Sequence, residues 1–392
     1  MSGDTLLLTG SGRLLLPELY AGPMPWAIAI RDGRFSFVGP RSDAPAGEAL
    51  DLGSALVTPG LVDAHTHPAF LGDRSDEAAA RLGGATYSGG GILRSVAATR
   101  AASDDELRAA ILGRLRAALA GGTTTIECKS GYGLSTSEEL RALRLIGEAA
   151  AQVPIRVVRT LLGAHAVPPE ADSMDAYAAT VADEMLPAAA AAGLAEFCDV
   201  FCDRDFFSLG ATERILRAAA TLGLGIRLHA DQLTRSGGAE LAVRLAASSA
   251  DHLEQLDAAG VAALAGSATV ATLLPGPALL MRGRLPPARG LLDAGVTVAL
   301  ASDANAGTFG AWGAMPLVIG LGATLLGITV AEAVTAATAG GAASLGLAGR
   351  CGVIRVEADA DLVAWDAEHE GAFALNLGSV RPLRTWVAGS TT

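Results

Sequence analysis

Residues 61–70, LVDAHTHPAF, form an apolar run that ends in a carboxylate and two imidazoles. The chain has only six histidines, and His65 and His67 are two of them. In an extended strand residues i and i+2 point to the same face, so both imidazoles reach toward one point. Burying polar side chains at the end of an apolar strand is costly unless a partner holds them. The stretch therefore predicts a buried strand that delivers His65 and His67 to a functional site, with Asp63 as a hydrogen-bond acceptor for the histidines.

Seven further apolar segments in the middle of the chain resemble this one. They are residues 123–130, 155–165, 196–202, 225–230, 249–253, 268–275 and 296–303. Stretches rich in Ala, Leu, Arg and Glu lie between most of them; one begins at the helix-capping Ser103 and ends in glycines. Eight strand–helix units over about 290 residues predict an α/β fold, a (β/α)8 TIM-like barrel, rather than a doubly wound sheet.

Reactive side chains gather at the ends of these predicted strands. They are His65, His67, Glu127, Lys129, His165, Asp199, Asp203, His229, His252 and Asp303. In a (β/α)8 barrel the carboxyl ends of the strands form one rim, where active sites lie. We therefore expect these groups to converge in space, although they are scattered along the sequence.

The two ends of the chain have a different character from the middle. Short strand candidates separated by turns fill residues 1–57, and GVIRV, ADLVAWD and VRPLRTWVAG return to this pattern after residue 350. The pattern predicts one small β-sandwich domain built from residues 1–57 and 346–392. The barrel is expected to span residues 58–345.

Composition excludes several kinds of partner. The chain of 392 residues is 51% hydrophobic and 18% charged, with a net charge of −12 and no basic cluster. This argues for a globular protein and against nucleic acid or an anionic membrane surface as partner. The first residues, MSGDTLLLTG, lack the basic region of a secretory signal.

Two other features leave alternatives open. The uncharged run between Asp303 and Glu332 is long enough for a transmembrane helix, but Pro316 and several glycines favour a loop that leads into a buried helix. The four cysteines include no CxxC pair, so reduced, buried thiols are expected, although Cys198 and Cys202 are close enough in sequence to share a metal.

The strand-end histidines have a metal-binding interpretation and a structural one. Imidazoles with one carboxylate suit zinc or iron, and His229 and Asp303 would complete a site for His65 and His67. The alternative is that the histidines only hydrogen-bond neighbouring loops and that Asp303 caps a turn. Lys129, the only lysine, is either the carboxylated bridge of a two-metal site or the partner of an ion pair with Glu127.

Several blocks of sequence resemble a known family. TPGLVDAHTHP, IRLHADQ, SSADHLE and ASDANAGT resemble the amidohydrolase superfamily, while FLGDRSDE, IECKSGYGL and TLLGAHAVPPE are similar to the imidazolonepropionase family within it. The resemblance runs nearly end to end. It implies a cytoplasmic enzyme, a homodimer, that opens the ring of the small molecule 4-imidazolone-5-propanoate by hydrolysis to N-formimino-L-glutamate in histidine degradation. It also implies one metal per chain, Zn²⁺ or Fe³⁺.

The resemblance implies a role for individual residues. The metal ligands it implies are His65, His67, His229 and Asp303. The catalytic residues it implies are His252, Asp303 and Gln232. The substrate-binding residues it implies are Arg74, Tyr87, Tyr132, His165, Gln232, Asn305, Gly307 and Thr308. The chemistry agrees, because a metal brings the pKa of water toward about 7 and an arginine fork binds a carboxylate at two points.

Two departures and two rival functions remain. A single residue, Ser88, separates Tyr87 from three glycines, so the loop that carries Tyr87 is short for the family; Asp231 stands where a glutamate is common. A deaminase or other cyclic amidase of the superfamily is the nearest rival. A deaminase would usually carry glutamate three residues after the fifth-strand histidine, where this chain has Gln232. A non-catalytic barrel is the other rival, but such a protein should have lost metal ligands.

Overall fold

Eight parallel strands form the centre of the molecule. The computed structural model describes residues 5–16, 20–21, 25–85 and 90–392. The strands are neighbours in chain order, from β8 to β15, which confirms the predicted barrel. They are β8 (Leu61–Asp63), β9 (Thr123–Lys129), β10 (Arg156–Ala164), β11 (Phe197–Cys202), β12 (Gly225–Ala230), β13 (Ser249–His252), β14 (Val270–Leu273) and β15 (Val298–Leu300).

The first and last strands of the barrel meet just beyond their carboxyl ends. The amide of Asp303 donates to the carbonyl of His65 at 3.0 Å, and the amide of His67 donates to the carbonyl of Ala304 at 2.9 Å. A parallel bridge joins Thr66 to Ala304. The seam that closes the barrel is therefore made by the residues that sequence reasoning singled out.

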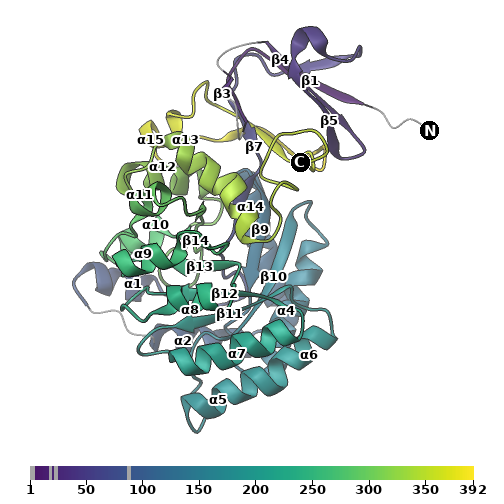
Figure 1. The fold of residues 1–392 in the computed structure, drawn as a ribbon. Coiled ribbons are helices and arrows are strands. Elements are labelled where there is room, and N and C mark those ends of the chain that lie inside the picture. Colours follow the sequence, from purple (N-terminus) through teal and green to yellow (C-terminus); the bar gives the residue numbers. More distant parts are fainter. Residues whose placement is uncertain (1–4, 17–19, 22–24, 86–89) are drawn as a thin grey trace.

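Helices surround the barrel and follow the strands (Figure 1). Ser103 caps the helix that follows it, as the sequence predicted. It forms a capping box in which Ser103 and Glu106 each accept a hydrogen bond from the other's amide. The helices are α1 (Ser75–Leu82), α2 (Gly90–Ala101), α3 (Asp104–Ala120), α4 (Thr136–Ala150), α5 (Met174–Thr180), η2 (Val181–Met185), α6 (Leu186–Ala191), α7 (Leu209–Thr221), α8 (Gly238–Arg244), α9 (Ala258–Leu264), α10 (Pro275–Leu280), α11 (Ala288–Asp293), α12 (Met315–Leu325), α13 (Val330–Thr335), η3 (Ala336–Gly340), α14 (Gly341–Ser344) and α15 (Ala372–Leu375).

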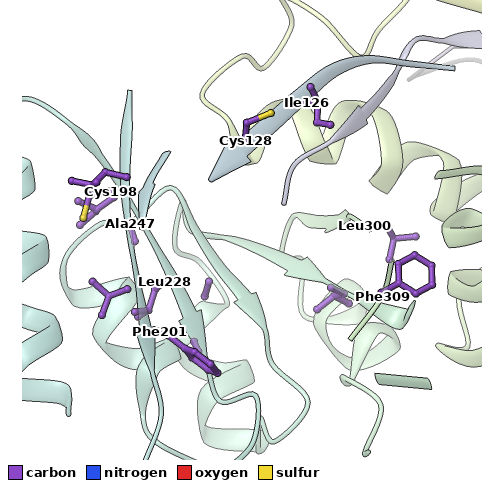
Figure 2. Packing of buried hydrophobic residues seen from close by; sticks show 14 of the residues in the cluster. Ile126, Cys128, Cys198, Phe201, Leu228, Ala247, Leu300 and Phe309 are labelled. Atoms are coloured by element: carbon purple, nitrogen blue, oxygen red, sulfur yellow. The ribbon is translucent and has the colours of Figure 1, made fainter. Parts of the chain in front are cut away.

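The main core lies between the strands and this layer of helices. Figure 2 shows part of it, with Ile126, Leu228 and Leu300 from three different strands all fully buried. Every residue of β9 and β11 is buried, as expected of parallel strands that are covered on both faces. The rigid wall built in this way fixes the positions of the strand ends.

Two small sheets pack together at one end of the barrel, where the purple and yellow ends of the chain lie side by side (Figure 1). They share a core that includes Ile28 and Phe35 of one sheet and Leu362 and Trp386 of the other. The first sheet has the order β5-β4-β1-β6 and the second β18-β17-β16-β7-β2-β3. Their elements are β1 (Leu6–Gly10), β2 (Leu14–Leu15), β3 (Tyr20–Ala21), β4 (Trp26–Arg31), β5 (Arg34–Pro40), η1 (Arg41–Asp43), β6 (Ala49–Asp51), β7 (Val57–Pro59), β16 (Leu362–Trp365), β17 (Pro382–Val387) and β18 (Ser390–Thr391).

This arrangement agrees with the predicted β-sandwich from both ends, while the boundaries at residues 57 and 346 stay a prediction. One strand prediction is wrong. GVIRV, residues 352–356, is a bend and turn, although Val353 and Ile354 are buried in the core of the small sheets. Their apolar side chains pack in this core, but their backbone does not pair with a described strand of either sheet.

The uncharged run after Asp303 forms a loop and then α12, whose Pro316 lies in the first turn and whose middle is buried. In the described part of the chain no helix is long and apolar enough to cross a membrane. All four cysteines are buried free thiols, as expected.

Candidate active site

Imidazoles and a carboxylate converge at the carboxyl end of the barrel. The Nε2 atoms of His65 and His67 lie 3.2 Å apart, and Oδ1 of Asp303 lies 3.6 Å from the first and 3.1 Å from the second. The His229 ring packs edge-on against His65, with centroids 4.5 Å apart. All four residues are buried.

Buried carboxylates hold two of these imidazoles from behind. Nδ1 of His65 lies 2.7 Å from Asp251, and Nδ1 of His229 lies 3.0 Å from Asp199. A carboxylate at Nδ1 keeps the proton there and leaves the Nε2 lone pair facing the centre of the site.

The expected role of Asp63 is wrong. Its carboxylate accepts from the amide and the hydroxyl of Ser302, at 2.9 and 2.6 Å, and so braces the segment next to Asp303. Burial raises the pKa of Asp63 to about 7, against the effect of the bonds from Ser302. The side chain supports the seam of the barrel and not the histidine rings.

A layer of fully buried charges lies beneath the histidines. The Nζ atom of Lys129 lies 2.7 Å from Glu127 and 2.7 Å from Asp199, and Arg227 donates to Asp251 at 3.1 Å. Of the two predicted roles of Lys129, the structure shows the ion pair with Glu127. Asp199 is a second carboxylate partner of the same ammonium group. Each cation neutralises a carboxylate that also holds an imidazole, which keeps those acceptors in place.

The donor set fits one metal ion. Two ligand atoms of a tetrahedral site at bond lengths near 2.1 Å lie roughly 3.4 Å apart. The three distances among His65, His67 and Asp303, 3.2, 3.6 and 3.1 Å, match that spacing. Burial lowers the pKa of both His65 and His67, and neighbouring cations add to this, so the imidazoles are neutral donors.

His252 lies beside this cluster. Its Nε2 is 4.0 Å from Oδ2 of Asp303, and its Nδ1 is 3.3 Å from the buried carboxylate of Glu254. Burial disfavours the charged form of His252, but Glu254 and Asp303 outweigh burial and raise its pKa. The backbone of His252 has a φ of +81°, a value sparsely populated for a residue with a side chain.

Most of the predicted site residues line one pocket above the cluster. His65 lies behind the lining, Gly307 borders a neighbouring cavity, and Tyr87 falls outside the described residues. The lining residues are His67, Arg74, Ile92, Tyr132, His165, Phe201, His229, Gln232, His252, Asp303, Asn305 and Thr308.

The walls of the pocket are ordered by hydrogen bonds and ring contacts. His165 bonds the carbonyl of Gly131 through Nδ1 at 2.8 Å and stacks on His67, with centroids 5.3 Å apart. Tyr132 meets the edge of His165. Oε1 of Gln232 is buried and has no hydrogen-bond partner within the described residues, so it offers an acceptor to a bound molecule.

Arg74 stands at the far side of the pocket, just ahead of α1. It is 4% exposed, and its guanidinium lies against the turn that follows Asp303. In that turn the side chain of Asn305 accepts from the amides of Gly307 and Thr308 and donates to the Thr308 hydroxyl. The pocket thus has imidazoles at one end and a guanidinium at the other.

Sequence reasoning missed several residues that build the site. Asp251 and Arg227 were passed over, although a charged residue inside an apolar strand is a signal of a buried pair. Glu254 was also missed, two residues after His252. Ile92 and Phe201 line the pocket and carry no sequence signal beyond their apolar character.

Comparison with known proteins agrees with the geometry. The model of the amidohydrolase family matches residues 56–392. The imidazolonepropionase of Ralstonia nicotianae is 47% identical over 363 residues, covering 90% of this chain and 89% of the relative, and that of Rubrobacter xylanophilus is 45% identical, covering 96% of each. A zinc-bound adenosine deaminase from Xanthomonas campestris superimposes with a TM-score of 0.73 at 21% identity, over 98% of this chain and 92% of that one, which shows a shared fold.

The chain belongs to the amidohydrolase family and is a hydrolase. Within that family it belongs with the imidazolonepropionases, whose similarity extends over nine-tenths of its length.

Proposed function

We propose that the chain opens the ring of 4-imidazolone-5-propanoate by hydrolysis to N-formimino-L-glutamate, a step of histidine degradation. The observation that carries the proposal is one pocket with an imidazole and carboxylate cluster at one end and Arg74 at the other. A small ring that bears a carboxylate arm matches both ends. The imidazolonepropionases at 45–47% identity support the same substrate.

In this proposal His65, His67, His229 and Asp303 hold one metal ion, Zn²⁺ or Fe³⁺. When bound, the metal polarises the ring carbonyl and favours deprotonation of water near neutral pH. The spacing of the donors and the carboxylates behind His65 and His229 support this assignment.

The chain's own residues move the proton. Oδ2 of Asp303 accepts a proton from the attacking water as its oxygen bonds to the ring carbonyl carbon. The bond from that carbon to the ring nitrogen then breaks, and the proton passes to the departing nitrogen with the help of His252 Nε2. The 4.0 Å between Oδ2 and Nε2 supports this assignment.

The remaining lining residues bind and orient the substrate. Arg74 meets the propanoate arm with two N–H donors, and Asn305, Gly307 and Thr308 shape the wall beside it. The unpaired Oε1 of Gln232 accepts from a ring N–H, while Tyr132 and His165 pack on the ring. We also assign Tyr87 to this group, and we expect a homodimer that works in the cytoplasm.

A coupled assay tests the proposal. Urocanase generates the unstable substrate in the cuvette, and its disappearance is followed with and without the purified protein. We expect a rate far above the spontaneous decay and about one equivalent of zinc or iron per chain. A rate equal to the spontaneous decay contradicts the substrate assignment, and an active preparation free of metal contradicts the mechanism.

A further inference from the structure

We propose that Glu77 positions Arg74 and so determines the selectivity of the pocket for a substrate with a carboxylate arm. This inference rests on the proposed function, in which Arg74 meets that arm. Glu77 lies behind Arg74 on α1, outside the lining of the pocket.

The first observation is a two-point ion pair. Nε of Arg74 donates to Oε2 of Glu77 at 2.9 Å, and Nη2 donates to Oε1 at 2.7 Å. Two parallel bonds fix the plane of the guanidinium as well as its position, which a single bond or a distant charge does not. The carboxylate thereby holds the edge of the Arg74 guanidinium that carries Nε and Nη2. Because the guanidinium is planar and rigid, this also fixes the direction of the edge that carries Nη1.

The second observation is the narrow slot that contains the pair. A Cβ atom built on Gly91 would lie 2.1 Å from both Nη2 of Arg74 and Oε2 of Glu77. A Cβ atom on Gly307 would lie 2.3 Å from Cζ of Arg74. The backbone at Gly91 and at Gly307 thus encloses the ion pair, and a side chain at either position would have to displace Arg74 from its present place.

The third observation is a second arginine beside Glu77. Glu77 also faces Arg81, whose Nη1 lies 3.6 Å away, and Nη2 of Arg81 donates to the carbonyl of Gly307 at 2.9 Å. Through Arg81, these contacts connect Glu77 on α1 to the turn after Asp303. Glu77 therefore contacts Arg74 directly and the turn beside Arg74 indirectly.

The test compares Glu77→Gln with Asp76→Asn in the holoenzyme. The Glu77→Gln variant keeps the size of the side chain. It replaces one of the two carboxylate oxygens that accept from Arg74 with an NH2 group, which cannot accept that hydrogen bond. We expect KM to rise at least tenfold while kcat stays within twofold and metal content is unchanged. Asp76 is the matched control, because this neighbouring acid of α1 is exposed and pairs with Arg94; its variant should behave as the wild type. Equal KM values for the two variants overturn the inference.

A second variant separates geometry from charge. Glu77→Asp keeps the charge, but its shorter side chain does not reach both nitrogens, so we expect KM to rise as in Glu77→Gln. A wild-type KM for Glu77→Asp shows that charge alone suffices and overturns the positioning role. This variant also decides the matter if Glu77→Gln does not fold.

A substrate in which the arm ends in an amide tests selectivity. The wild type should prefer the carboxylate at least tenfold in kcat/KM, and Glu77→Gln should lose most of that preference. A crystal structure of Glu77→Gln gives a result that does not depend on the substrate. If the wild type fails to turn over 4-imidazolone-5-propanoate, the proposed function fails; a displaced Arg74 guanidinium then supports the positioning role, and an unmoved one overturns it.

Discussion

The two ends of the pocket are built by different means. At the histidine end, the side chains stand at the ends of β12 and β13 and just beyond β8 and β15, with Asp199 and Asp251 fully buried behind them. At the arginine end, Arg74 stands ahead of a helix of eight residues, and its partner Glu77 is 24% exposed. In the proposed function, a rigid sheet fixes the reacting centre, whereas a loop and a short helix fix the substrate's arm. We therefore expect replacements at the two ends to change chemistry and selectivity independently.

Asp303→Ala is expected to have the largest effect. It removes a proposed metal ligand together with the proposed proton acceptor, so activity should fall at least about 10⁴-fold and the metal should be lost. Metal analysis and the coupled assay measure the two effects. Asp293→Ala, at an exposed aspartate paired with Arg289, is the control. Retention of both metal and activity in Asp303→Ala would exclude the site from catalysis.

His252→Ala should come next. The ring lies beside Asp303 without completing the proposed ligand set, so the metal should stay while kcat falls about 10³-fold. A kcat near that of the wild type removes His252 from the proton path. Loss of metal instead would make it a ligand.

Arg74→Ala tests the arginine end of the pocket. The arm would lose a two-point charged contact, so KM should rise about 100-fold, equivalent to roughly 3 kcal/mol, with metal content unchanged. KM and kcat are measured separately beside metal analysis. If metal is lost instead, Arg74 supports the structure of the rim and the two ends are not independent.

Asp251→Asn should have the smallest effect on chemistry. The amide still contacts Nδ1 of His65, but it holds the ring less firmly and leaves Arg227 without that carboxylate. Metal affinity should fall about 10- to 100-fold, with a lower Tm. Competition with a chelator measures the affinity, and an unchanged affinity would show that the buried carboxylate serves only Arg227.

The barrel could be predicted because its strands are short apolar runs separated by helix-length segments, and parallel strands buried on both faces leave that signature in the sequence. The rim followed from the same pattern, because His229 and Asp303 come at strand ends. The partners behind the histidines could not be assigned in this way. Asp251 and His65 are separated by 186 residues, and only the register of the strands brings them together.

The errors have physical causes as well. Asp63 is two residues from His65 in the sequence, but a strand that enters the seam directs its carboxylate across to Ser302. Val353 and Ile354 of GVIRV are buried in the core of the small sheets, and side-chain burial alone does not require a strand. The contact of Glu77 with Arg74 spans one turn, but nothing in the sequence separates it from the many exposed ion pairs on helices.

The seam of the barrel has a consequence for the order of assembly. Asp63 and Ser302 are 239 residues apart, and the amide of Asp303 bonds the carbonyl of His65. During synthesis β8 is therefore made long before β15, and His65 and His67 come next to the Asp303 carboxylate only after β15 has been made. A partly made chain that lacks β15 therefore does not present the complete set of proposed metal ligands. A metal ion bound across the seam would stabilise the closed barrel against opening.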